Sequence, residues 1–319
     1  MENSKMKIIF IGTPEFGAIV LEELIKDGYP PILVISSPDK PVGRKHNITP
    51  PPVKVLAEKH GIEIIQPEQI QSSKSKIQNL EPDLIVVAAY GQIIPKKILD
   101  IPKRGSLNIH PSLLPKYRGS SPIQFTILNG EKKSGVTIIL MDEKIDHGKI
   151  ISNFQFQISN EKITYPELLK ELAKLGAKLL LETIPKWVRG EIKPKPQNEA
   201  KAIYTKILTK EDGKIDWQKS AKVLEREIRA FYPWPGSYTI WANRGKLIKI
   251  KILKSRVFKS PDKIKYPIGK VLVVPQNEIG AQCGKDFLVI EKLQREGGKE
   301  MASEDFPKGH PDFIGTILK

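Results

Sequence analysis

Short apolar runs alternate with helical patterns through the first half of this 319-residue chain, and no other feature restricts its fold as strongly. Repetition of strand and helix predicts a parallel sheet covered by helices on both faces. The expected strands are 6–11, 31–36, 62–65, 84–89, 106–110 and 136–141, and later expected helices are 53–60, 121–128 and 165–188. We therefore expect a doubly wound, Rossmann-like α/β domain whose ligand site lies outside the carboxyl ends of the strands.

The first strand leads into a helix with recognisable start and stop signals. Thr13 can cap this helix, Pro14 suits its first position, and Glu15 favours the positive end of its dipole. Gly28 is the expected stop. The segment 12–17 has glycine at both ends but lacks the Gly-x-Gly-x-x-Gly spacing of dinucleotide-binding loops. A nicotinamide-dependent oxidoreductase is therefore disfavoured.

A second domain is expected beyond a linker. Residues 190–213 contain Pro194 and Pro196 and show little periodicity, which is typical of a linker. A helix at 221–231 follows, and then short strands separated by turn residues, expected at 238–242, 247–253, 268–274 and 287–293. This pattern predicts a small, OB-like β-barrel. The expected division is a first domain at 1–190, a linker at 191–210 and a β-barrel domain at 211–319.

Positive charge is concentrated in the second domain. The net charge is +16 at pH 7, and residues 201–319 carry 24 Lys and Arg against 14 Asp and Glu. The alternation in one expected strand would put Lys246, Lys249 and Lys251 on one face. A basic strand face on a barrel favours a polyanionic partner such as a nucleic acid. The alternative is the ordinary solvated surface of a lysine-rich protein.

Cysteine content and hydropathy exclude several classes. Cys283 is the only cysteine, so no internal disulfide can form, and no His/Cys cluster has the spacing of zinc ligands. The apolar run at residues 8–11 is too short for the apolar core of a signal peptide, and no run of 18 apolar residues exists. We expect a cytoplasmic protein with no membrane segment and no metal.

The densest cluster of polar and glycine residues includes the fifth expected strand and the residues after it. Residues 105–119 read GSLNIHPSLLPKYRG. Asn108 and His110 are two residues apart on a strand, so they point to the same face, at the end where an α/β site opens. Without further context, a histidine and an asparagine satisfied by local hydrogen bonds would explain the pair equally well.

This segment, together with a downstream Asp-x-Gly at Asp146, closely resembles the folate-dependent formyltransferases. Their pattern is Asn-x-His-x-Ser-Leu-Leu-Pro, then Tyr/Trp-Arg-Gly, then Asp-x-Gly, and the chain departs from it in having His147 where Thr is frequent. The resemblance implies that Asn108, His110 and Asp146 are the catalytic residues. It also implies 10-formyltetrahydrofolate as formyl donor, bound in part by Ser112, Leu113, Leu114 and Pro115.

An amine acceptor makes these three residue types sufficient for the reaction. An α-amino group has an ordinary pKa of about 7.7 to 8.0, so it needs little activation near pH 7. The harder task is to stabilise the tetrahedral oxyanion, to which Asn108 and a protonated His110 can donate hydrogen bonds. Asp146 would hold His110 charged and relay the proton from the amine toward the leaving folate nitrogen.

Two further segments resemble the family members that formylate methionine on initiator tRNA. Residues 37–54 resemble an inserted loop whose basic tip reaches the acceptor stem, and Arg44 and Lys45 occupy that tip. Residues 228–236, IRAFYPWPG, resemble the opening of the C-terminal barrel of these members. The resemblance therefore implies initiator methionyl-tRNA as partner, bound in part by the basic strand face, and we expect a monomer.

Two other classes remain open from the sequence. A sugar-nucleotide N-formyltransferase would use the same folate site, act on an amino sugar and have little need of Arg44. A non-catalytic RNA-binding module would use the basic barrel alone, and the intact Asn-His-Asp set argues against it. The loop around Arg44 also has the composition of an ordinary solvated turn.

Overall fold

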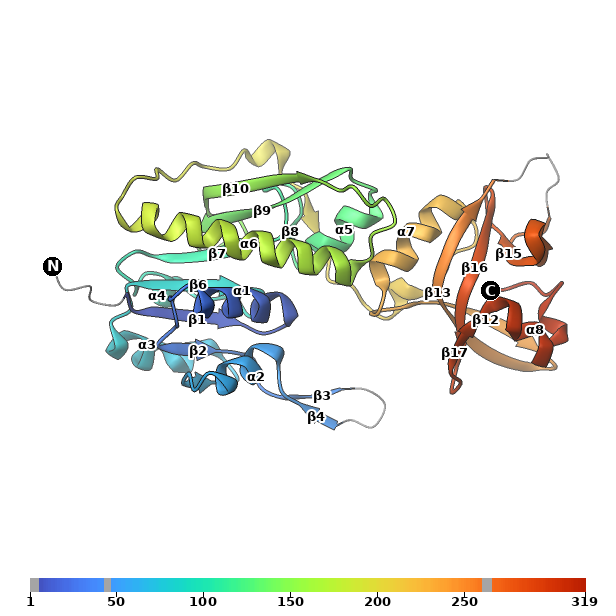
Figure 1. Cartoon of the computed structure of the whole chain (residues 1–319), viewed down its shortest axis with the longest axis horizontal. Coiled ribbons are helices and arrows are strands. Elements are labelled where there is room, and N and C mark those ends of the chain that lie inside the picture. Colours follow the sequence, from blue (N-terminus) through green and yellow to red (C-terminus); the bar gives the residue numbers. More distant parts are fainter. Residues whose placement is uncertain (1–5, 43–46, 260–265) are drawn as a thin grey trace. The chain divides into compact units, whose positions relative to one another are not determined.

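The computed structural model describes residues 6–42, 47–259 and 266–319, and the chain divides into two compact units (Figure 1). The first unit comprises Met1–Pro122, Lys133–Ile158 and Glu167–Lys206, and the second comprises Ile123–Lys132, Ser159–Pro166 and Ile207–Lys319. Among the described residues, no helix combines the length and the apolar character needed to cross a membrane.

A seven-stranded sheet organises the first unit, in the order β10-β9-β7-β6-β1-β2-β5. Its strands are β1 (Ile8–Gly12), β2 (Leu33–Ile35), β5 (Ile64–Ile65), β6 (Leu84–Ala88), β7 (Ser106–His110), β9 (Lys133–Leu140) and β10 (Lys149–Gln157). Five neighbouring strands of this sheet are parallel, namely β7, β6, β1, β2 and β5. This confirms the Rossmann-like expectation. β9 pairs antiparallel with β7, and β10 pairs antiparallel with β9. The expectation of a wholly parallel sheet was therefore wrong. The reason is that β9 begins beside the carboxyl end of β7, where Thr137 pairs with His110, without a crossover to the other end.

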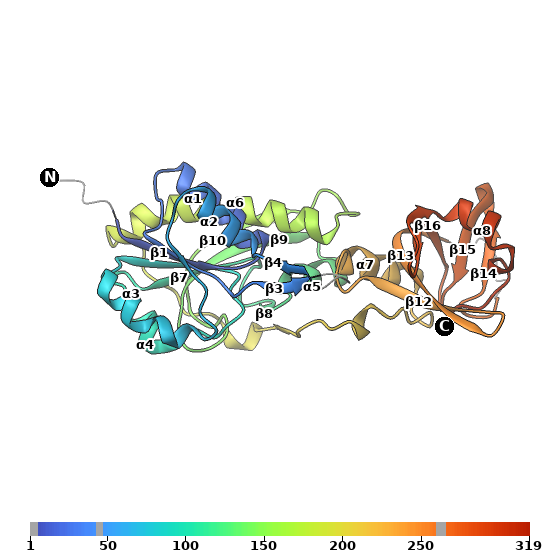
Figure 2. The same ribbon diagram turned by 90° about the horizontal axis from the view of Figure 1, so that it is seen from below.

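Helices cover both faces of this sheet (Figure 2). One face carries α1 (Glu15–Lys26), α2 (Pro52–Lys59) and α6 (Tyr165–Val188), and the other carries α3 (Lys74–Leu80) and α4 (Lys96–Leu99). All five residues of β1 and of β6 are buried, as strands covered on both sides require. The continuous apolar runs in the sequence reflect this double burial.

The packing decides which way the residues of β7 point. A Cβ added to Gly176 of α6 would lie 2.7 Å from Ile109 Cγ2, so α6 packs closely over the face to which Ile109 points. Side chains alternate along a strand, so Asn108 and His110 point to the opposite face. Asn108 is paired there with Val87 of β6, which packs in the core beneath α3 and α4.

The start of α1 differs from the expectation. Pro14 occupies the N-cap position, and no side chain caps the helix. Thr13 Oγ1 lies 3.1 Å from Ser37 Oγ and accepts a hydrogen bond from the Ser37 N–H, because the chain after β1 lies beside the end of β2. Thr13 therefore ties two strand ends together instead of capping the helix. The stop at Gly28 is confirmed, since that residue has φ of 83° just after Lys26.

The second unit is built on a curled antiparallel sheet in the order β12-β13-β16-β15-β14, with β17 paired to β16. Its elements are α7 (Ala221–Phe231), β12 (Ser237–Asn243), β13 (Lys246–Phe258), β14 (Val271–Val274), β15 (Glu278–Gln282), β16 (Phe287–Arg295), β17 (Glu300–Ala302) and α8 (Phe306–Gly309). Ser220 caps α7 by accepting from the Val223 N–H. The expectation of a small barrel-like β domain is confirmed, although β15 was not expected.

The core of this second unit lies inside the curled sheet. Trp241 is almost fully buried and makes edge-to-face contacts with Phe306 and Phe313, at centroid distances of 5.8 and 5.4 Å. Cys283 lies in the same apolar cluster and is also buried. The thiol is therefore enclosed among hydrocarbon side chains, which oppose the formation of a thiolate.

We expect Cys283 to react with a thiol reagent only when the second unit opens. Burial raises the pKa of this thiol from 9.0 to about 12, so at pH 8 the folded chain holds about 10³-fold less thiolate than the unfolded chain. The folded state keeps its proton between these values while the unfolded state loses it, so this group lowers the stability as pH rises from 9 to 12. Labelling with a chromogenic disulfide, with and without denaturant, measures the difference. Rapid labelling of the native chain would contradict the assignment.

The segment at residues 195–205, called the strap below, belongs to the first unit. Lys195 forms backbone hydrogen bonds of 2.7 and 2.9 Å with Ile150 of β10. Farther on, β11 (Tyr204–Thr205) pairs in parallel with β8 (Arg118–Gly119). Much of the stretch expected as a linker at 191–210 is therefore bound to the first unit by backbone pairing.

A short hairpin lies between β2 and α2. It consists of β3 (Lys40–Val42) and β4 (Asn47–Thr49), which pair antiparallel. Arg44 and Lys45, the expected basic tip, lie outside the described residues. The helix α5 (Pro122–Leu128) and the 3-10 turns η1 (Ile70–Ser73), η2 (Glu199–Lys201), η3 (Glu211–Gly213), η4 (Pro275–Asn277), η5 (Ser303–Asp305) and η6 (Pro311–Phe313) complete the described elements.

Candidate active site

Asn108, His110 and Asp146 lie together in the first unit. The side chain of His110 is 5% exposed and that of Asp146 is 15% exposed. Asn108 and His110 are brought together by their spacing on β7, whereas Asp146 comes from the loop between β9 and β10. The three residues implied by the resemblance are therefore neighbours in space, in a largely buried position.

The carboxylate of Asp146 is the hub of this cluster. Its Oδ1 accepts a hydrogen bond from Asn108 Nδ2 at 3.2 Å and lies 3.5 Å from His110 Nδ1. Its Oδ2 accepts from the backbone N–H of Gly119 at 2.8 Å. Hydrogen-bond donors therefore face both oxygens of the carboxylate. Asn108 uses one of its two amide hydrogens here, so the other remains for a ligand.

The ring of His110 is oriented by a second contact. Its Nε2 lies 2.9 Å from the carbonyl oxygen of Tyr117. A carbonyl oxygen can only accept, so Nε2 carries a proton in both charge states of the ring. Nδ1, which faces Asp146, is therefore the nitrogen that gains or loses a proton. A histidine held in this way can donate from Nδ1 when it is charged.

The loop of residues 112–115 is bonded mainly to itself and to β9. The Ser112 hydroxyl donates to the Lys116 carbonyl at 2.6 Å, and Thr137 Oγ1 links the Ser112 carbonyl to the Leu114 N–H. Ser112 and Leu114 are buried, whereas Leu113 and Pro115 are partly exposed. Apolar contact from the latter two is what this loop can offer to a ligand.

A buried arginine adjoins the cluster, and its contacts were not anticipated from the sequence. Arg118 has no exposed side-chain surface and forms an ion pair with Glu199 of the strap, with Nη2 and Oε1 2.6 Å apart. Hydrogen bonding to Glu199 raises the pKa of Arg118 above its already high value, and the same contact lowers the pKa of Glu199. The ion pair therefore favours the charged form of both groups.

His147, the departure from the family pattern, contacts acidic residues. Its Nδ1 lies 2.6 Å from Asp142 Oδ2, and its Nε2 lies 3.6 Å from Glu199 Oε1. His147 thus bridges the β9–β10 loop and the strap, while Asp146 keeps its contacts with Asn108 and His110. Among the described residues, no three His, Cys, Asp or Glu side chains are grouped where they could hold a metal ion.

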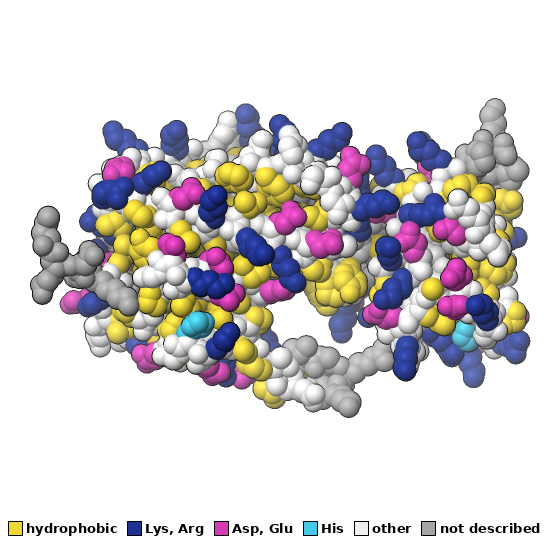
Figure 3. All heavy atoms as spheres, viewed as in Figure 1, with side chains coloured by type: hydrophobic (Ala, Val, Ile, Leu, Met, Phe, Trp, Pro, Cys, Tyr) yellow, Lys and Arg dark blue, Asp and Glu magenta, His cyan; other side chains and the backbone are white. Residues whose placement is uncertain are grey.

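The basic strand face contains two of its three expected residues. Lys249 and Lys251 share the outer face of β13, opposite Ile240 and Tyr238 of β12, and Lys249 Nζ lies 3.5 Å from the centroid of the Tyr238 ring. Lys246 is an even number of residues from the inward-facing Ile250 and Ile252, so it belongs to their face of the strand. Its side chain is exposed because it is the first residue of the strand, just after a turn. The expectation that all three share one face was therefore wrong. Figure 3 shows basic and acidic side chains interspersed over the visible surface of each unit.

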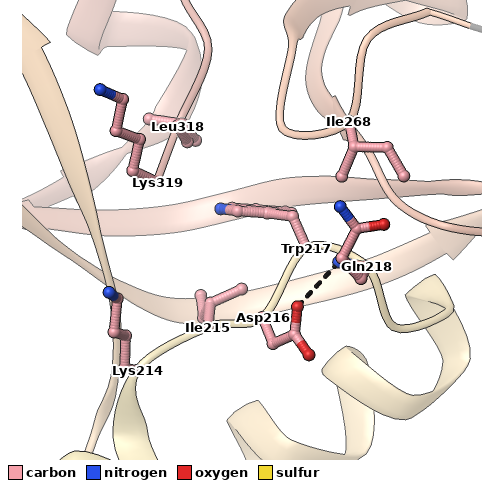
Figure 4. A pocket seen from close by; sticks show the side chains of 8 residues that line it. All are labelled: Lys214, Ile215, Asp216, Trp217, Gln218, Ile268, Leu318 and Lys319. Atoms are coloured by element: carbon pink, nitrogen blue, oxygen red, sulfur yellow. Dashed lines mark hydrogen bonds between the residues drawn. The ribbon is translucent and has the colours of Figure 1, made fainter.

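A shallow pocket of about 420 Å³ lies in the second unit (Figure 4). Its lining includes the buried side chain of Trp217, whose Nε1 donates to Thr239 Oγ1 at 3.0 Å. Asp216 accepts from the backbone N–H of Gln218 at 3.0 Å. None of the expected site residues lies in this pocket.

Family comparisons agree with this two-domain fold. Residues 6–184 match the family described as formyl transferase, and residues 207–311 match the formyl transferase C-terminal domain. The chain is therefore a two-domain formyltransferase. Methionyl-tRNA formyltransferases of Bacillus velezensis and Citrifermentans bemidjiense are 44% and 40% identical to it, each over 98% of this chain and 97% and 96% of their own. The chain belongs to the methionyl-tRNA formyltransferase family, which confirms the resemblance and the assignment as an enzyme.

Two solved structures share the fold at lower identity. HypX from Aquifex aeolicus, in complex with tetrahydrofolic acid, superposes with a TM-score of 0.63 at 19% identity, over 96% of this chain and 48% of that chain. WlaRD, a sugar 3N-formyl transferase, superposes with a TM-score of 0.62 at 23% identity, over 92% of this chain and 98% of that chain. Both structures share the fold of this chain.

Proposed function

We propose that this chain transfers the formyl group of 10-formyltetrahydrofolate to the α-amino group of methionine on initiator tRNA. The observation that carries the proposal is the contact of Asn108, His110 and Asp146, in a chain 40 to 44% identical to methionyl-tRNA formyltransferases over nearly its full length. Formylmethionyl-tRNA, the product, serves translation initiation. Residues 1–190 would bind the donor and residues 211–319 would contribute to tRNA binding.

The geometry supports a direct transfer. The neutral amine attacks the formyl carbon, and the free amide hydrogen of Asn108 and the Nδ1–H of charged His110 stabilise the resulting oxyanion. The bond between the formyl carbon and the folate nitrogen then breaks, and the proton lost by the amine goes to that nitrogen. Asp146, 3.5 Å from His110 Nδ1, holds the imidazolium and carries this proton, directly or through water.

Substrate contacts are assigned to two sets of residues. Leu113 and Pro115 would contact the folate, while Ser112 and Leu114 shape the same loop from within. Phosphates of the tRNA would be bound by Arg44, Lys45, Lys246, Lys249 and Lys251. Such phosphate contacts set a salt-dependent affinity and not a choice of sequence. We propose that the chain acts as a monomer.

The test is formyl transfer measured side by side on three acceptors: charged initiator methionyl-tRNA, free methionine and an amino-sugar nucleotide. Fast transfer to the tRNA alone is expected, with the Arg44→Ala variant losing at least about tenfold in kcat/KM as one tRNA contact is removed. Transfer to the sugar nucleotide alone would overturn the choice of acceptor. Absence of transfer to any acceptor, despite folate binding, would overturn the proposed activity.

A further inference from the structure

The backbone around the Asp146 carboxylate has positive φ at three residues, two of which are not glycine. Asp146 has φ of 47°, Tyr117 has φ of 63°, and Gly119 has φ of 103°. Non-glycine residues adopt this left-handed region only when the surrounding structure compels them. Tyr117 and Gly119 supply the contacts to His110 and Asp146 described above, so the position of these groups depends on whatever holds the two loops.

Gln197 of the strap holds the Asp146 loop. Its Nε2 donates to the carbonyl oxygens of Asp146 and Gly148, both at 2.8 Å. Its Oε1 accepts from Nε and Nη2 of Arg118, at 3.1 and 2.9 Å. The amide can satisfy these partners in only one orientation, because the carbonyls need a donor and the guanidinium needs an acceptor. The side chain therefore joins the two loops on either side of the catalytic cluster.

Arg118 is fully committed to this arrangement. Its side chain makes five donor contacts, two with Gln197, two with Glu199 and one with the Tyr204 hydroxyl, which accounts for all its N–H groups. The backbone N–H of Arg118 also donates to the Ile203 carbonyl at 2.8 Å. A buried guanidinium needs such partners, because an unpaired charge away from water is costly. Arg118 is thus a rigid anchor for Gln197.

We propose that Gln197, anchored by Arg118, is a positioning residue for the reaction, which holds Asp146 at the distance from Asn108 and His110 that transfer requires. The inference rests on the proposed function. The strap contacts the β9–β10 loop and the chain before α5. Gln197 is the strap residue whose side chain bonds the backbone of Asp146. Without the two donors of Gln197, the left-handed Asp146 would relax and its carboxylate would move from His110.

The Gln197→Glu variant tests this role with little change in volume. The carboxylate keeps an oxygen that accepts from Arg118, but it replaces the amide nitrogen and its two N–H donors with one oxygen, which the Asp146 and Gly148 carbonyl oxygens repel. We expect kcat for formyl transfer to methionyl-tRNA to fall about 10- to 100-fold, as for a misplacement near 1 Å, with KM for both substrates unchanged within about twofold. Gln155→Glu, an exposed site on β10, is the matched control with wild-type kinetics.

A double-mutant cycle with Asp146→Asn separates positioning from general destabilisation. If Gln197 acts through Asp146, Gln197→Glu has little further effect on kcat in the Asp146→Asn background. Three results would overturn the proposal: additive losses of kcat in the double variant, a rise in KM with unchanged kcat, or wild-type kcat for Gln197→Glu. If Gln197→Glu does not fold, as judged by circular dichroism and thermal unfolding, Gln197→Met is measured in its place with the same criteria. Inactivity of the wild type on methionyl-tRNA would contradict the proposed function instead.

Discussion

The Asp146→Asn variant is expected to lower kcat for formyl transfer by about 10² to 10⁴-fold, the range typical of a lost general acid–base residue. The amide oxygen can still accept from the Gly119 N–H, so its NH2 group would face His110 Nδ1, where the carboxylate now lies 3.5 Å away. An amide there can donate to a neutral ring but cannot stabilise a charged one. His110 would then be held neutral and unable to donate to the oxyanion.

Single-turnover measurement with saturating methionyl-tRNA isolates this step from binding and release. Affinity for tRNA, measured by filter binding, is expected to change little, because the contact is buried. Glu143→Gln, which removes an exposed carboxylate from the same loop, is the matched control and is expected to retain wild-type turnover. Wild-type turnover in Asp146→Asn would remove Asp146 from the mechanism.

The Asn108→Ala variant is expected to lower kcat by about 10² to 10³-fold, because it removes one donor from the oxyanion. It also removes the 3.2 Å hydrogen bond to Asp146 Oδ1, which leaves that oxygen facing His110 alone. We expect the loss to appear in kcat and not in KM for the folate, since an oxyanion contact forms only in the transition state.

The control for Asn108→Ala is Asn153→Ala on β10, where the side chain is exposed and the same atoms are removed. Thermal unfolding of both variants checks that the sheet is intact, because Asn108 is itself largely buried. A rise in KM with unchanged kcat would mean that Asn108 contributes to binding of the substrate ground state. In that case another group would have to stabilise the oxyanion.

The elements with strong periodicity were predictable from the sequence. The expected helices at 165–188 and 221–231 coincide with α6 and α7, and the strand at 106–110 coincides with β7. β10 was not expected, because Lys149–Gln157 is mostly exposed and only Phe154 and Phe156 alternate with polar residues. β15 is short, and its middle residue is Gly280, so its sequence resembles a turn more than a strand. Both strands form by antiparallel pairing with the strands next to them in the chain, β10 with β9 and β15 with β14 and β16.

The site was predictable only in part from local pattern. Asn108 and His110 followed from strand parity at the carboxyl end of β7, whereas Asp146 followed only from the resemblance to a family. No local signal shows that Gln197 and Glu199 contact Arg118, since 81 residues separate Glu199 from Arg118 and the prolines nearby suggest a linker. Contacts of this kind depend on how the chain returns to the sheet, which residue spacing does not encode.

The return of the strap to the first unit bears on where this protein can be divided. A fragment ending at residue 190 would keep the seven-stranded sheet and all of Asn108, His110 and Asp146. It would nevertheless lack every strap side chain that Arg118 bonds and the two hydrogen bonds from Gln197 to the Asp146 loop. The smallest independently competent fragment is therefore longer than the smallest fragment that completes the sheet. Excision, fusion or shuffling of the catalytic half has to respect a border near residue 206, where the first unit ends.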